Sequence, residues 1–310
     1  MSENNQENIF ALKVDVDTLR GYLEGMPPML EVLAKYGVKA SFFFSFGPDN
    51  SGKAIYRIFR KGFLRKMLRT KAPSTYGLKT MMYGTLLPAP LIAEKNPQIM
   101  TDTFKEGHEC GIHAWDHVKW QDRLPRLSRK EITEELTRAK NLFKSILGEE
   151  PRSFAAPGWQ ITPDALAVLD SCCFDYMSNT RGAFPFLPVI KGQSFQTPEI
   201  PSTLPTMDEI LGANGIDDNT IVPYYLSLLK EGLNVHTVHT EMEGKSKINQ
   251  FAALIRGVLD RGYRIIPLSH VTSLLKNVPR SEIVSWILPG RAGTLALQEE
   301  IVPSGVLPKG

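Results

Sequence analysis

The chain has 310 residues, enough to bury the core of one α/β barrel or of two smaller domains. Its 36 basic and 33 acidic residues give a formal charge of +3, so the composition as a whole does not indicate a nucleic-acid-binding protein. The three cysteines are too few for a disulfide framework, and no apolar run reaches the roughly 18 residues that span a bilayer. Since residues 1–8 also lack the pattern of a secretory signal, we expect a cytoplasmic protein with reduced thiols.

The first predicted element is a strand over residues 9–16, and two acidic side chains lie at its end. Asp15 and Asp17 alternate with apolar Val14 and Val16. Residues i and i+2 of a strand project to the same face, so both carboxylates point in one direction. One of them can bind a metal ion while the other handles protons.

A basic segment follows the second predicted strand, which spans residues 39–46. Residues 51–93 contain nine basic residues and no acidic one. Aliphatic and aromatic side chains are interleaved with the basic ones at a spacing that suits an amphipathic helix with a cationic face. This pattern predicts a surface that associates with anionic lipid, through residues such as Arg57, Phe59, Arg60, Phe63, Arg65 and Lys66. A helix packed on the core with solvated charges is the alternative, and no motif of a nucleic-acid-binding fold is present.

Two of the six histidines follow the third predicted strand, residues 107–113. His113 and His117 are four residues apart, a spacing that places both rings on one face of a helical turn. Such a pair is half of a zinc site, because a catalytic zinc takes three protein ligands and leaves one position for water. Asp15 or Asp17 can supply the third ligand. Two solvated residues on a helix are the alternative interpretation of this pair.

The rest of the chain alternates between predicted strands and helices. Further strands are expected at residues 152–156, 174–178, 234–240 and 263–267, and helices at 27–36, 97–106, 129–147, 163–170, 251–261 and beyond 269. The long helix at 129–147 begins with a capping box at Ser128 and Glu131 and ends at Gly148. A stretch with five prolines, residues 185–205, is expected to be extended. About seven alternations predict a parallel α/β barrel with catalytic residues at the carboxyl ends of its strands.

The histidines outside the pair receive separate predictions. His239 ends the strand at 234–240, and the alternation along that strand points His236 to the opposite face. His236 and His270 are therefore expected to be structural. His108 lies at the start of the third strand, where we expect it at the surface.

Four short motifs follow predicted strands in order: Asp15-Val16-Asp17, His113-x-x-x-His117, Ala156-Pro157-Gly158-Trp159 and Val238-His239. This order resembles the polysaccharide deacetylase (NodB-like) family over nearly the whole chain. The resemblance implies a distorted seven-stranded (β/α) barrel over residues 1–280, with the basic insertion at about 51–93, and a C-terminal tail over 281–310. It also implies a metal-dependent hydrolase that cleaves amide bonds.

The same resemblance implies roles for individual residues. Asp17, His113 and His117 would hold one divalent metal ion, with zinc as the first candidate and manganese or cobalt as alternatives. Asp15 would be the general base and His239 the general acid. The substrate site would include Trp159, Trp115, Pro157 and Gly158. Backbone N–H groups of the third motif could hold the oxyanion.

One position departs from the family pattern. Many members carry an arginine in the third motif, which is thought to orient the base, whereas this chain reads Phe154-Ala155-Ala156-Pro157. Arg181 is the candidate for the missing orienting residue. A surface turn residue next to Gly182 is the alternative interpretation of Arg181.

Within the family, the chain is most similar to bacterial deformylases that act on 4-deoxy-4-formamido-L-arabinose linked through phosphate to undecaprenol. The similarity lies in segments such as Gly47-Pro48-Asp49-Asn50, Arg181-Gly182-Ala183-Phe184-Pro185-Phe186, Thr203-Leu204-Pro205-Thr206 and Glu241-Met242-Glu243-Gly244. It implies a role in lipid A modification and resistance to cationic antimicrobial peptides, and a peripheral position on the cytoplasmic face of the inner membrane. A soluble N-acetyl-sugar or cyclic-amide hydrolase, and a non-catalytic lipid- or metal-binding module, are the alternatives.

Overall fold

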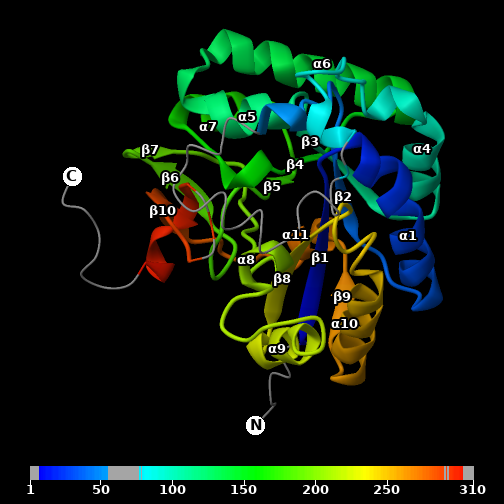
Figure 1. Cartoon of the computed structure of the whole chain (residues 1–310). Coiled ribbons are helices and arrows are strands. Elements are labelled where there is room, and N and C mark those ends of the chain that lie inside the picture. Colours follow the sequence, from blue (N-terminus) through cyan, green and yellow to red (C-terminus); the bar gives the residue numbers. More distant parts are fainter. Residues whose placement is uncertain (1–6, 55–76, 78, 290, 292, 303–310) are drawn as a thin grey trace.

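A parallel sheet forms the centre of the protein (Figure 1). The computed structural model describes residues 7–54, 77, 79–289, 291 and 293–302. Within them, seven strands follow the order β5–β4–β3–β2–β1–β8, with β9 also paired to β1. The strands are β1 (Ile9–Val16), β2 (Ser41–Ser45), β3 (Glu109–Ala114), β4 (Ser153–Phe154), β5 (Tyr176–Met177), β8 (Leu233–His239) and β9 (Arg264–Ile266). The predicted α/β barrel with seven strands is confirmed.

The side chains of the central strand β1 alternate between the outer core and the inside of the barrel. One edge of β1 pairs with β8 along Ile9–Asp15, while the other pairs with β9 near its start and with β2 near its end. Even-numbered residues from Phe10 to Val16 pack in the larger core, whereas Ile9 and Ala11 pack in a separate inner cluster. Because strand residues alternate, Lys13, Asp15 and Asp17 continue this inner row towards the carboxyl end of the sheet.

The proline-rich stretch closes the barrel between β5 and β8. Ile200 N–H donates to the carbonyl of Met177 at 2.8 Å, and Ser202 N–H donates to Thr180 at 3.0 Å. On the other side, Thr203 N–H donates to the carbonyl of Val235 in β8 at 3.0 Å. The stretch is extended, as predicted, and it replaces a regular strand. This replacement is what distorts the barrel.

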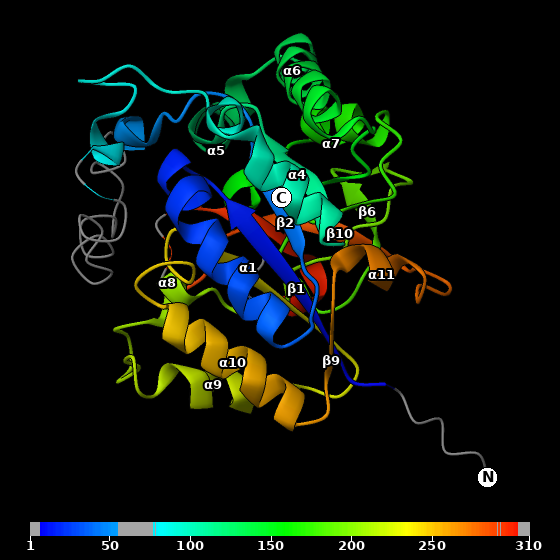
Figure 2. The same cartoon turned by 90° about the vertical axis from the view of Figure 1, so that its right-hand side faces the viewer.

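Helices cover the outside of the sheet (Figures 1 and 2). They are α1 (Met26–Lys35), α4 (Pro97–Lys105), α5 (His117–Arg123), α6 (Arg129–Leu147), α7 (Pro163–Asp170), α8 (Met207–Ile210), α9 (Ile221–Leu228), α10 (Ile248–Asp260) and α11 (Leu268–Thr272). Single turns are η1 (Gly21–Gly25), η3 (Thr80–Met82), η4 (Ala93–Lys95), η5 (Leu124–Arg126), η6 (Pro157–Trp159) and η7 (Glu299–Ile301). The capping box at Ser128 and Glu131 is confirmed, as is the left-handed Gly148 at the end of α6.

His108 contradicts its prediction. Its side chain is buried against Phe42, and its Nδ1 accepts a hydrogen bond from the backbone N–H of Ala40. The residue directly precedes β3 and contacts β2 through the ring of Phe42. A surface position was inferred from its place at the strand entrance, but the aromatic contact and the hydrogen bond bury the ring.

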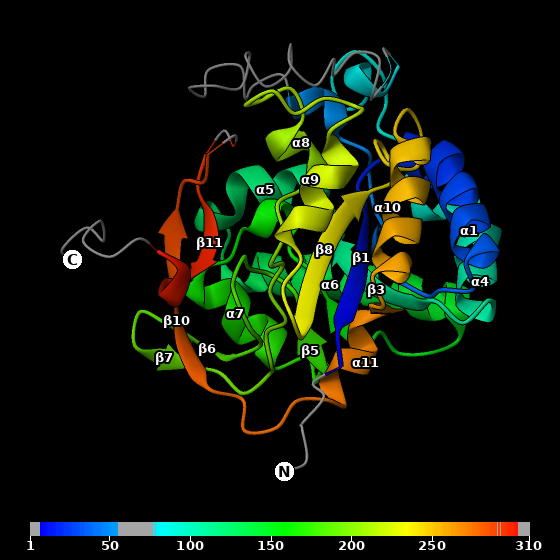
Figure 3. The same ribbon diagram turned by 90° about the horizontal axis from the view of Figure 1, so that it is seen from below.

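A second, smaller sheet lies beside the barrel (Figure 3). It contains β6 (Leu187–Ile190), β7 (Gln193–Ser194), β10 (Arg280–Trp286) and β11 (Leu295–Gln298), in the order β11–β10–β6–β7. The C-terminal tail that we expected over residues 281–310 thus includes β11 and all of β10 except its first residue. Arg181 N–H donates to Ala296 at 3.0 Å and Gln298 N–H donates to Arg181 at 2.8 Å, so β11 is bound directly to the barrel.

The basic insertion is described only at its two ends. Arg57, Phe59, Arg60, Phe63, Arg65 and Lys66 lie outside the described residues. The returning end is held to the barrel because Ile92 N–H donates to Gly47 at 2.9 Å and Asp49 N–H donates to Pro90 at 2.8 Å. Among the helices that the structure describes, none has both the length and the apolar composition to cross a membrane.

Candidate metal centre and active site

Three ligand-type side chains meet at the carboxyl end of the sheet. Asp17 follows β1, His113 lies near the end of β3 and His117 is the first residue of α5. The Nε2 atoms of His113 and His117 lie 3.3 Å and 3.4 Å from the two carboxylate oxygens of Asp17. One ligand atom from each residue falls within 4.8 Å of the others, so the three can share one ion. Of the two carboxylates at the end of β1, Asp17 lies in this group and Asp15 does not.

The two histidines do not lie on one helix, contrary to the interpretation of their spacing. The chain leaves β3 after Ala114 and starts α5 at His117, so a strand-to-helix turn brings the rings together with centroids 5.2 Å apart. Asp116 is the N-cap, and its Oδ1 accepts the N–H of Lys119 at 2.9 Å. This cap ends the turn and orients the first helical residue.

The protonation of His113 makes the site suited to a cation. Its Nδ1 is 2.7 Å from the carbonyl of Ala155, a contact that places the proton on Nδ1. The lone pair of Nε2 then faces Oδ1 of Asp17, a buried oxygen that accepts no hydrogen bond from the described residues. Two lone pairs facing each other at 3.3 Å repel unless a proton or a metal ion lies between them, so this geometry is compatible with a bound cation. Two imidazoles and one carboxylate form a donor set typical of zinc and of manganese or cobalt.

Electrostatics keep Asp17 ionised. Burial acts to raise the pKa of Asp17, but the neighbouring His117, His113 and His239 outweigh it and hold the pKa well below its usual range. A carboxylate that stays charged at neutral pH is the form that binds metal.

Asp15 and His239 occupy neighbouring strands at the same level. They are register partners between β1 and β8, so both lie at the carboxyl end of the barrel beside Asp17. Burial acts to lower the pKa of His239, but Asp17, Asp208, Asp15 and Glu243 raise it to about 9. These four carboxylates thus favour the protonated form of His239 in the metal-free site.

The cation beside Asp15 is Lys13. Its Nζ lies 3.5 Å from Oδ2 of Asp15, and both side chains are buried. Arg181, which we expected to orient Asp15, instead places its guanidinium 2.8 Å from the carboxylate of Glu209 and donates through Nε to the carbonyl of Ser202 at 3.2 Å. Arg181 is also buried, so it is not a surface turn residue.

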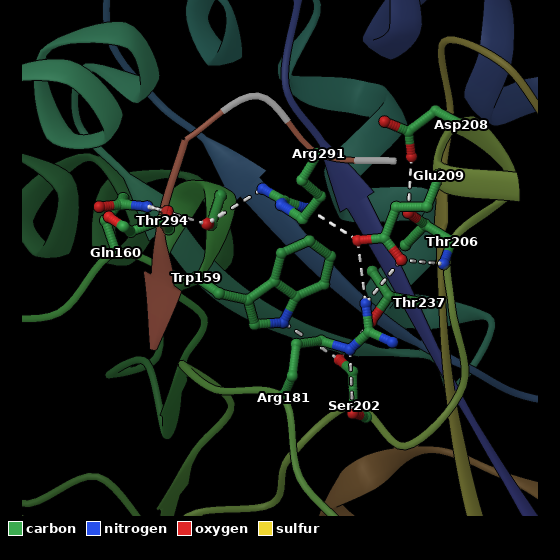
Figure 4. Close-up of polar contacts among 11 residues, drawn as sticks. Trp159, Gln160, Arg181, Ser202, Thr206, Asp208, Glu209, Thr237, Arg291 and Thr294 are labelled. Atoms are coloured by element: carbon green, nitrogen blue, oxygen red, sulfur yellow. Dashed lines mark hydrogen bonds and ion pairs between the residues drawn. The ribbon is translucent and has the colours of Figure 1, made fainter. Parts of the chain in front are cut away.

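Trp159 is buried, and two arginines lie beside its ring (Figure 4). Arg181 and Arg291 lie 5.3 Å and 4.8 Å from the ring centre, and both contact Glu209. Gly158 and Trp159 both adopt left-handed backbone conformations, with φ of 59° and 54°, which turns the indole inwards. The N–H of Trp159 already donates to the carbonyl of Ala156 at 3.1 Å, so it is not a free oxyanion donor.

The other two predicted substrate residues are in different settings. Pro157 is buried at the start of the η6 turn. Trp115 lies between β3 and α5, where its carbonyl accepts the N–H of Gly47 at 2.8 Å. The Trp115 ring is half-buried and packs so closely on Gly47 that a Cβ there would lie 2.6 Å from it. Trp115 thus belongs to the short loop between His113 and His117.

Four residues of the site were not identified in the sequence. They are Lys13, Asp208, Glu209 and Arg291. A lysine within a buried apolar strand was a visible signal for the first of them, because such a charge requires a partner. The other three lie outside the recognised motifs and are brought in by contacts between distant segments.

Comparisons with known proteins show the family and the fold of this chain. Residues 4–177 match the family model described as polysaccharide deacetylase. That span is more than half of the chain. The chain belongs to the polysaccharide deacetylase family. A structure of a polysaccharide deacetylase from Mycobacterium smegmatis shares the fold of this family member, with a TM-score of 0.63, 16% identity and coverage of 93% of this chain and 96% of that one.

Two relatives of this deacetylase-family chain are similar over almost its full length. A protein of Shewanella sediminis (strain HAW-EB3) is 36% identical over 304 residues, covering 97% of this chain and 98% of the relative. A protein of Wigglesworthia glossinidia brevipalpis is 32% identical over 285 residues, covering 90% and 98%. Both are described as probable 4-deoxy-4-formamido-L-arabinose-phosphoundecaprenol deformylase ArnD.

Proposed function

We propose that the protein hydrolyses the formamide of 4-deoxy-4-formamido-L-arabinose linked through phosphate to undecaprenol. Water adds its oxygen to the formyl carbon, the C–N bond breaks, and formate and the 4-amino sugar are released. Similarity to two relatives with this name over nearly the whole chain supports the substrate. The observation that carries the chemistry is the convergence of Asp17, His113 and His117 at the barrel end that also bears Asp15 and His239.

We assign Asp17, His113 and His117 to the metal, with zinc as the first candidate. A divalent ion held there would lower the pKa of water and polarise the formyl carbonyl. Asp15 accepts the proton of the attacking water. Its Oδ1 is buried and receives no hydrogen bond from any described residue, so it is available for this task.

His239 completes the reaction by protonating the departing nitrogen. An amide anion is too poor a leaving group, so a proton must reach the nitrogen as the C–N bond breaks. In the metal-free site the neighbouring carboxylates raise the pKa of His239 to about 9, which supports the imidazolium form as the proton donor. The place of His239 beside Asp15 on the neighbouring strand supports an acid and a base that act on the same substrate.

A lipid-linked substrate accounts for the surface next to this site. A groove of about 410 Å³ adjoins Leu19, two residues after Asp17, and it has apolar walls with two lysines: Leu19, Tyr83, Leu87, Pro88, Ala89, Pro90, Lys79 and Lys95. Leu86 beside it is 81% exposed. An isoprenoid chain suits the apolar walls and a phosphate suits the lysines, so we assign this groove to the lipid part of the substrate.

Peripheral membrane association follows from the same assignment. The basic insertion would contact anionic lipids, and the free cysteines fit the reducing side of the inner membrane. Reversing Arg57, Arg60 and Lys66 to Glu should abolish sedimentation with phosphatidylglycerol vesicles. Reversing the exposed Lys130, Arg138 and Lys144 on α6 gives the same charge change and should leave sedimentation intact.

The decisive assay measures formate released from the lipid-linked formamido sugar. Release should stop with a chelator and return on addition of zinc, manganese or cobalt. Hydrolysis of a water-soluble N-acetyl sugar in preference to this substrate would instead favour a soluble deacetylase. Binding of the lipid without release of formate or acetate would favour a non-catalytic lipid-binding module.

A further inference from the structure

Lys13 is a fully buried charge in the middle of the central strand. Its side chain is 0% exposed, and it lies between the apolar Leu12 and Val14 on β1. Lysine is almost never buried completely unless it is paired, because removing its charge from water is costly. A lysine at this position therefore needs specific partners.

The ammonium group has partners on several sides. Nζ donates to the carbonyl of Ser178 at 3.1 Å and lies 3.5 Å from Oδ2 of Asp15. It also lies 5.5 Å from the ring centres of Phe43 and of Trp159. A carbonyl, a carboxylate and two aromatic faces fix the position of the group.

These contacts place Lys13 between Asp15 and the ring of Trp159. Oδ2 of Asp15 faces the ammonium, whereas Oδ1 is free of hydrogen bonds from the described residues. Oδ2 is thus held by Lys13, whereas Oδ1 is available to accept a proton. Burial lowers the pKa of Lys13, while the charges of Asp15 and Glu199 act to raise it.

Arg181 does not perform this task, because its guanidinium is bound to Glu209 and to the carbonyl of Ser202. The third motif, Phe154-Ala155-Ala156-Pro157, supplies no cation. Among the ion pairs of the described residues, the one that involves Asp15 is with Lys13.

We propose that Lys13 is the positioning residue of this active site, holding Oδ2 of Asp15 so that Oδ1 faces the reacting water, and that it replaces the arginine missing from the third motif. Its catalytic consequence rests on the proposed function. Lys13 acts from within the same strand as the base. The spacing Lys13-x-Asp15-x-Asp17 therefore puts the positioning residue, the base and a metal ligand on one strand face.

A double-mutant cycle in the metal-free protein tests the pairing without any substrate. Lys13→Met and Asp15→Asn each leave one buried partner alone, whereas the double variant removes both. We expect the fall in the urea midpoint of the double variant to be clearly smaller than the sum of the two single falls. The exposed pair Lys144–Glu150, changed to Met and Gln, should show additive effects close to zero.

Kinetics test the positioning role. Lys13→Met should lower kcat about a hundredfold, as expected for a misplaced base, with KM and metal content unchanged. In the Asp15→Asn background the same change should lower the residual rate by less than about twofold. Lys13→Arg should restore part of the lost kcat, because it returns the charge.

Each outcome decides the proposal. Additive midpoints, or an equal loss of kcat in both backgrounds, would overturn it. If Lys13→Met alone fails to fold but the double variant folds, the pairing is supported; if both fail, Lys13 is structural through other contacts and the proposal falls. A wild-type protein that releases no formate would contradict the proposed function, while the urea cycle would still decide the pairing.

Discussion

Glu209 and Arg291 form an ion pair with Oε1 and Nη1 3.0 Å apart, and the same carboxylate contacts Arg181 at 2.8 Å. The Glu209 side chain is only 3% exposed, so its single negative charge balances two arginines away from water. Glu209→Gln should therefore cost about 3–5 kcal/mol of unfolding free energy, because it removes the carboxylate that pairs with the buried Arg181 and the half-buried Arg291. Urea unfolding measures this loss.

Two variants serve as comparisons for Glu209→Gln. Glu134→Gln, on the exposed face of α6, should change the unfolding free energy by less than about 0.5 kcal/mol. Arg291→Met should cost less than Glu209→Gln, because Glu209 keeps its contacts with Arg181. Equal losses for Glu209→Gln and Glu134→Gln would mean that the cluster in Figure 4 does not hold the C-terminal segment to the barrel.

Replacing His113 with Ala should remove the metal. The change deletes one of the three donors and leaves Asp17 and His117, so we expect the affinity for zinc to fall by about 100-fold or more, with loss of formate release. Elemental analysis of the purified variant measures the bound metal. His270→Ala, an exposed position on α11, should retain both metal and activity; retention of metal by His113→Ala would exclude it as a ligand.

The rate should fall at alkaline pH because His239 must be protonated to act. In the metal-free site the pKa of His239 is raised to about 9, and a metal ion on Asp17 opposes part of that shift, so kcat of the metal-loaded enzyme should decline at or below that pH. Asp208 is among the charges that raise this pKa, so Asp208→Asn should move the decline to lower pH. A pH profile of kcat measures both. An alkaline limb that is unchanged in Asp208→Asn would remove Asp208 from this role.

Buried histidines should make the fold sensitive to acid. Burial lowers the pKa of His236 to about 3 and that of His108 to about 4, whereas unfolded histidine titrates near 6.5. Below pH 6.5 the unfolded chain binds protons that the folded chain does not, so the unfolding free energy decreases by up to about 1.4 kcal/mol per pH unit for each histidine. Urea unfolding at pH 7, 6 and 5 gives the slope.

His236→Leu isolates one contribution to this acid sensitivity. The variant should reduce the slope of unfolding free energy against pH by about one proton, because leucine does not titrate. His270→Leu changes an exposed histidine and should leave the slope as it is in the wild type. A slope that His236→Leu does not alter would show that His236 is protonated alike in the folded and unfolded chains.

Much of the barrel was predictable because its strands and helices carry local signals. The strand at residues 9–16 agrees with β1 residue for residue, and the capping box fixes the start of α6. The row of inward residues that ends in Asp17 follows from strand alternation. Each recognised motif follows a predicted strand, which indicated that the motifs lie together at the carboxyl end of the sheet.

The smaller sheet and the charged cluster were not predicted, for a different reason. β6 and β7 lie within the proline-rich stretch, and β10 and β11 lie where we expected a tail, so their pairing depends on partners far away in the chain. The histidine pair was assigned to a helix because a spacing of four residues fits one. A capping residue, Asp116, directly before His117 was the local sign that a helix begins there.

The pairing of β1 with β8 also governs when the protein can fold during its synthesis. Ile9 pairs with Leu233 and Asp15 with His239, so most of the chain must leave the ribosome before β1 gains its second neighbour. Until then, one edge of a hydrophobic strand is open to other nascent chains. A polypeptide terminated before β8 would carry Asp17, His113 and His117 but lack His239, and the unpaired edge of β1 would favour aggregation.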